Sequence, residues 1–151
     1  MLFRSDVQVE LALTAAGDVA GTVTETLRGD RAQGRRDLYD ELASDDKIRK
    51  YLERVVNYDF SGAELLDYTL EGRTAPDAPL LLTYRFRRTG YARPQGNSLV
   101  IEDRYDMPDL TRRYARLPDR TVPMLINERS DEQVDVRLTA PGGFADRKSV
   151  V

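Results

Sequence analysis

Acid–base chemistry in this sequence would have to come from carboxylates, tyrosines or a few lysines, because the chain contains neither His nor Cys. Their absence excludes Ser–His and Cys–His nucleophilic catalysis, metal sites built on imidazole or thiolate, and disulfides. Lys47 and Lys50 lie among acidic residues, without the apolar pocket that Schiff-base chemistry needs. The residue types therefore favour a chain without catalytic chemistry.

An acidic run is the strongest candidate for a metal site. It consists of Glu102, Asp103, Asp106 and Asp109, and a calcium ion takes six to eight such oxygen ligands. The run lacks the spacing of a calcium-binding loop, and Arg104 interrupts it, so a solvated loop is the favoured interpretation. A carboxylate pair for glycoside hydrolysis cannot be selected by spacing among 26 acidic residues. We predict no catalytic residue, no metal and no cofactor.

A basic stripe raises the question of an anionic ligand. It contains Arg85, Arg87, Arg88 and Arg93, near Tyr84 and Tyr91. Leu80, Leu82, Tyr84 and Phe86 alternate with the first two arginines, which is typical of a strand with one wet face. The net charge of −3 also argues against a nucleic-acid partner.

Length and composition indicate one soluble globular domain. The chain has 151 residues, of which 40% are apolar and 32% charged. No apolar run approaches the 18 or more residues of a bilayer span, so we predict no direct membrane insertion by this segment.

Hydrophobic periodicity predicts the elements. Apolar residues alternate over 7–13 and 19–27 around a turn at 15–18, which predicts a β-hairpin. Residues 31–56 change to a helical period, and Ser44 or Asp45 would cap a second of two short helices. Strands are predicted again at 63–71, 80–86, 98–102 and 134–138. The pattern predicts a mainly β fold, α+β at the margin: an antiparallel β-sandwich of about seven to nine strands with one helical insertion near 31–56.

Both ends look foreign to this domain. Residues 146–151 are what GAT CGG AAG AGC GTC GTG encodes, and residues 1–5 fit CTC TTC CGA TCT after a GTG start codon. Both strings resemble ends of a widely used sequencing adaptor. We therefore expect a single accessory domain at 6–145, and little contribution to the core from 1–5 and 146–151.

The order of features resembles a protein family. The matching pieces are the 13–19 hairpin turn, Leu27-Arg28-Gly29, Asn57-Tyr58, the 80–84 strand and the 120–124 segment. The last piece is the C-terminal segment 134–144, which contains Pro141-Gly142-Gly143. Together they resemble the C-terminal β-sandwich domain of unknown function in bacterial transglutaminase-like proteins, also described as cysteine proteases. The resemblance implies an upstream transglutaminase-like domain of the same chain as partner, with the catalytic Cys, His and Asp there. It also implies a periplasmic or cell-surface parent protein.

The expected function is a non-catalytic structural accessory domain that packs on or positions the catalytic core. The alternative is a carbohydrate- or peptide-binding module of an exported protein, which exposed Tyr side chains on one concave face would favour. An independent hydrolase would require a pocket with two close, buried acids. The predicted interdomain contact is formed by Tyr105, Met107, Leu110, Tyr114, Leu117, Val122, Met124 and Leu125.

Overall fold

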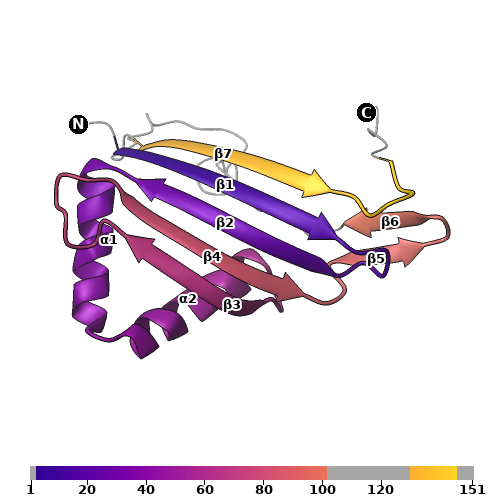
Figure 1. The fold of residues 1–151 in the computed structure, drawn as a ribbon, viewed down its shortest axis with the longest axis horizontal. Helices are drawn as coiled ribbons and strands as arrows, with labels where there is room; N and C mark the ends of the chain where they lie inside the picture. The colour runs from indigo at the N-terminus through magenta and orange to yellow at the C-terminus, as the bar shows by residue number, and fades with distance from the viewer. Residues whose placement is uncertain (1–2, 102–129, 146–151) are drawn as a thin grey trace, which may run out of the picture.

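The computed structural model describes residues 3–101 and 130–145, which form seven strands and two helices (Figure 1). In chain order these are β1 (Phe3–Leu13), β2 (Val19–Leu27), α1 (Gly29–Leu42), α2 (Asp45–Asp59), β3 (Glu64–Glu71), β4 (Leu80–Arg88), β5 (Ala92–Gln95), β6 (Ser98–Ile101) and β7 (Ser130–Thr139). The predicted mainly β class with a helical insertion is confirmed.

Five strands form one large sheet in the order β3-β4-β2-β1-β7, and β5 with β6 forms a small hairpin at one end of it (Figure 1). β1 and β2 pair antiparallel from Ser5 opposite Leu27 onward, as the hairpin prediction requires. β7 pairs parallel to β1, with Val7 beside Val134. Two details therefore differ from an antiparallel sandwich. The large sheet is mixed, and in the described ranges its apolar face packs on helices instead of a second large sheet.

The two helices follow from local signals. α2 has buried Ile48, Leu52 and Val56 at four-residue steps, which gives it one apolar stripe. The side chain of Ser44 caps it by accepting a hydrogen bond from the Lys47 backbone amide at 3.4 Å. Ala43, at a φ of 59°, reverses the chain between the helices. The predicted division into two helices, capped at Ser44 or Asp45, is confirmed, and Ser44 is the cap.

The core lies between the helices and one face of the large sheet. Val9, Val23 and Leu82 face the helices and are buried with the apolar stripe of α2. At the end of α2 the Phe60 ring stacks on Phe86 of β4, with centroids 4.2 Å apart. The helices thus substitute for the second sheet of a sandwich.

Two findings concern elements at the margins of the prediction. Residues 3–5 belong to β1, and Ser5 is fully buried and accepts a hydrogen bond from Arg31 at 2.7 Å. The expectation that residues 1–5 lie outside the core is therefore wrong for Ser5. β5 was not predicted, because it has four residues and contains Pro94, which weakens a strand pattern. No helix in the described part is long and apolar enough to cross a bilayer.

Candidate functional site

The predicted interdomain contact lies outside the described residues. All eight of its members fall between 102 and 129, and so does the acidic run from Glu102 to Asp109. Both stay predictions. Elsewhere, in 3–101 and 130–145, no group of three or more carboxylates is placed to hold a metal ion.

The basic stripe is engaged by partners across the strands. Arg85 forms a two-pronged ion pair with Asp67 of β3, with Nε 2.8 Å from Oδ1, and its hydrogen bonds lower the pKa of Asp67. Arg87 pairs with Glu64 at 2.8 Å. Arg85 and Arg87 therefore lie on the solvent side, as the alternation predicted, and the structure gives each of them a carboxylate.

The helix-free face of the large sheet carries a shallow depression of about 470 Å³. Its lining includes the small residues Ala12, Ala20 and Thr22 of the central strands, together with the charged residues Glu10 and Arg137. A surface of small and polar side chains is typical of a sheet face that contacts solvent.

The tyrosines do not gather on a described face. Tyr39, Tyr84 and Tyr91 are buried, whereas Tyr58 on α2 is 89% exposed. Tyr51 and Tyr68 are half-buried. The Tyr-lined concave surface that would favour carbohydrate binding is therefore not found in the part of the chain described.

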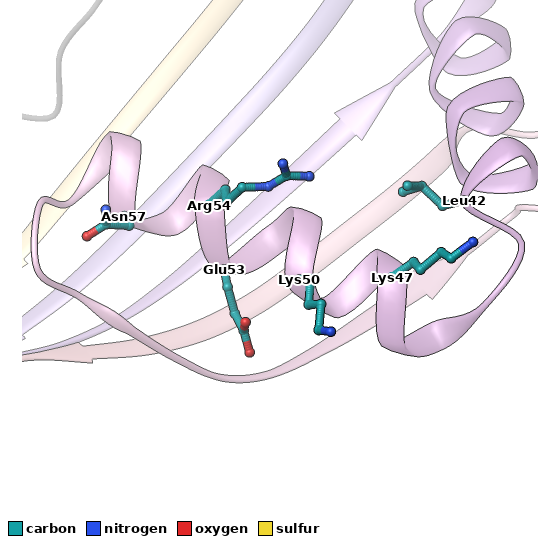
Figure 2. A pocket seen from close by; sticks show the side chains of 6 residues that line it. All are labelled: Leu42, Lys47, Lys50, Glu53, Arg54 and Asn57. Atoms are coloured by element: carbon teal, nitrogen blue, oxygen red, sulfur yellow. The ribbon is translucent and has the colours of Figure 1, made fainter.

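A second depression, of about 570 Å³, lies along the solvent side of α2 (Figure 2). It is lined by Leu42, Lys47, Lys50, Glu53, Arg54 and Asn57. Figure 2 shows the side chains of Lys47 and Arg54 extending toward Leu42 at the end of α1, while Lys50 and Glu53 point to the other side of α2. Glu53 pairs with Arg49 at 3.3 Å. The two lysines and Arg54 have no ion pair within the described ranges, so this surface is locally cationic.

A polar cluster beneath the helices was not predicted. Glu25 lies on the inward side of β2, where Val23 and Leu27 are buried, and its carboxylate is 3.8 Å from the guanidinium of Arg35. Arg35 donates a hydrogen bond to the Tyr51 hydroxyl at 3.0 Å. The signal was present, because strand alternation assigns Glu25 to the apolar face.

Burial controls the protonation of this cluster. It raises the pKa of Glu25, against the opposing charge of Arg35. It raises the pKa of Tyr39 to about 12, although the charge of the neighbouring Arg35 opposes that rise. Burial and the charge on Glu25 also raise the pKa of Asp59, which a hydrogen bond from Tyr84 opposes.

Glu25 and Asp59, both half-buried, are the described acids whose pKa burial raises, which is a property of the acid pair that a hydrolase needs. Neither of them lines either of the two depressions. Glu25 is moreover neutralised by Arg35, so the cluster is arranged to join α1 and α2 to β2. Its geometry supports a structural role better than a catalytic one.

Comparison of the chain with protein-family models, with curated proteins and with solved structures found no match. The resemblance to the C-terminal domain of transglutaminase-like proteins consequently remains a prediction from the sequence. The surface of the described residues is the remaining basis for inferring function.

Proposed function

We propose that the chain is a non-catalytic accessory domain of a larger protein and that it binds the surface of another protein or domain. The observation that carries this proposal is an apolar strip on β7, formed by Val134, Val136 and Leu138. Val136 is 46% and Leu138 47% exposed, although their neighbours in β1, Val9 and Leu11, are buried. Val134 is half-buried against the core, whereas no helix or strand of the described residues covers Val136 and Leu138, as expected of a surface that another protein covers.

The charged residues support the same proposal, because many of them maintain the fold. The Arg36 guanidinium is buried and bonded to backbone carbonyls of the 72–78 connection. Arg73 pairs with Asp40 at 2.9 Å. Side chains held in this way are positioned for stability rather than for turnover.

The identity of the larger protein follows from the resemblance alone. We propose a transglutaminase-like parent, with this domain after the catalytic core. The contact with that core is assigned to the series from Tyr105 to Leu125. The β7 strip is then a second surface, which we expect to be covered by protein in the full-length parent.

The test is to replace the strip with polar residues of good strand propensity, Val136→Thr with Leu138→Thr. In the full-length parent, backbone amides of 134–138 should exchange hydrogen more slowly than in the dilute 151-residue chain, and the double variant should lose this difference. Leu66→Thr is the matched control, because Leu66 is 42% exposed and lies on β3, the opposite edge strand. Equal exchange in the parent and in the isolated chain would contradict the proposal.

A second candidate function is binding of an acidic peptide, favoured by the cations of the α2 depression. Lys47, Lys50 and Arg54 all line this depression and span seven residue steps of the helix, about 10 Å at 1.5 Å per residue. A short Glu-rich peptide labelled for fluorescence anisotropy should bind, and Lys50→Glu with Arg54→Glu should abolish binding. Arg87→Glu, which changes charge on the sheet, should not. Binding that survives the helix variants would exclude this site.

A further inference from the structure

Strand β7 combines its apolar strip with an edge that no other described strand pairs with. In the described sheet it has β1 on one side and no strand on the other. A ten-residue edge strand leaves a row of backbone donors and acceptors available for another strand. Its side chains alternate between the strip on the helix side and Asp135 and Arg137 on the helix-free side.

We propose that two copies of this chain associate by antiparallel pairing of β7 with β7, around a two-fold axis through Val136. The proposal rests on the proposed function and names the partner of the β7 strip as a second copy. In this register Val136 faces Val136 of the other copy, and Val134 faces Leu138. Asp135 faces Arg137, and the symmetry repeats both contacts.

This register is selected by complementarity. Opposite charges and apolar pairs directly across two strands are each stabilising, whereas like charges are unfavourable. An axis through Asp135 would place two carboxylates opposite each other, and an axis through Arg137 would place two guanidinium groups together. An axis through Val134 would set Val136 against Glu132, an apolar residue against a charged one.

The resulting assembly keeps the layers of each copy intact. An axis perpendicular to the sheet leaves both pairs of helices on the same side and joins two five-stranded sheets into one. The apolar strips then cover each other across the axis. In a single copy Arg137 and Asp135 approach at 3.5 Å along the strand, with side chains 73% and 49% exposed. Both are therefore free to exchange this weak contact for the one across the axis.

The experiment is sedimentation velocity on the full 151-residue chain over a range of concentrations. We expect a dimer that dissociates on dilution. Asp135→Arg alone and Arg137→Asp alone each create two like-charge pairs and should raise the dissociation constant roughly tenfold or more. The double variant Asp135→Arg with Arg137→Asp restores both opposite pairs and should restore the dimer. Exchanging the Asp67 and Arg85 charges on β3 and β4 is the matched control and should leave the dissociation constant unchanged.

Two results would overturn the inference. One is a chain that stays monomeric up to roughly 1 mM. The other is a dimer that the single exchanges do not weaken, or that the double exchange does not restore although circular dichroism shows a folded chain. A monomeric chain whose parent still protects residues 134–138 would reject the second copy as partner and retain the accessory function. An intact dimer of the chain, combined with no protection of residues 134–138 in the parent, would retain the second copy as partner and reject the accessory function.

Discussion

Arg36 shows how a single buried cation can hold a connection in place. Its side chain is 3% exposed and donates hydrogen bonds to the carbonyl oxygens of Gly72 at 3.0 Å, Pro76 at 3.3 Å and Ala78 at 2.5 Å. These carbonyls belong to the link between β3 and β4, so Arg36 attaches that link to α1. Backbone dipoles take the place of a carboxylate partner.

Arg36→Met should lower the free energy of unfolding by about 2–4 kcal/mol, because it leaves buried carbonyl oxygens without donors. Urea unfolding measures the change. Arg54→Met, at an exposed position of α2, should alter the free energy by about 0.5 kcal/mol or less. Equal effects of the two substitutions would show that the carbonyl contacts do not stabilise the fold.

Glu25 should make stability depend on pH in an unusual direction. Burial raises its pKa above the ordinary 4.5, so the folded chain binds this proton more tightly than the unfolded chain. The contribution of Glu25 to stability is therefore largest below pH 4.5 and is lost as the pH rises through its raised pKa.

The measurement is urea unfolding of the native chain and of Glu25→Gln across this pH range. The stability of the native chain relative to the variant should decline as the pH rises above 4.5. Asp67→Asn is the control of opposite sign. The pKa of Asp67 lies below its ordinary 3.8, so its contribution is lost as the pH falls through that lowered pKa. A difference between native chain and Glu25→Gln that is constant with pH would contradict the assigned burial.

At the scale of elements, the packing of β2 on β4 depends on the absence of a side chain at Gly21. A Cβ atom there would lie 2.2 Å from Cζ of Phe86, whose ring is fully buried and stacked on Phe60. The ring has no free space into which to move, because interiors are close-packed. Gly21 thus allows α2, β2 and β4 to meet at one point.

Gly21→Ala should lower the free energy of unfolding by about 1–3 kcal/mol through overpacking. In the background of Phe86→Leu the same substitution should cost clearly less, since the shorter side chain makes room for the methyl group. A double-mutant cycle by chemical denaturation gives the coupling. Independent, additive effects would place the Phe86 ring elsewhere.

At the scale of the whole molecule, the first residues of β1 connect the large sheet to the helices. β1 lies between β2 and β7, and Ser5 pairs in register with Leu27 and Glu132. The Arg31 guanidinium on α1 donates to the Ser5 hydroxyl and lies 4.0 Å from Glu132. Strands β2 and β7 and helix α1 therefore all meet β1 at this residue.

Deleting residues 1–5 should consequently lower the melting temperature by roughly 3–6 °C, equivalent to about 1.5 kcal/mol in a domain of this size. Calorimetry of the shortened chain measures this. Ser5→Ala should reproduce part of the loss, because it removes the acceptor for Arg31. An unchanged melting temperature would show that the contacts of Ser5 do not stabilise the fold.

Local patterns in the sequence were sufficient for the hairpin, the two helices, the cap at Ser44 and the two faces of β4. Alternation, helical period and capping each depend on residues a few positions apart, so they can be read without knowing the fold. By the same alternation, Glu25 could have been assigned to the inward face, although its partner Arg35 could not.

Only the tertiary structure decided which elements meet. The parallel pairing of β7 with β1 joins residues more than a hundred positions apart, and no local pattern distinguishes it from an antiparallel pair. The apolar face of a strand specifies that something must cover it, but a helix and a second sheet satisfy that requirement equally well. For this reason the sequence determined the elements and their faces, while the helical cover, the Arg36 anchor and the uncovered strip on β7 emerged from the packing.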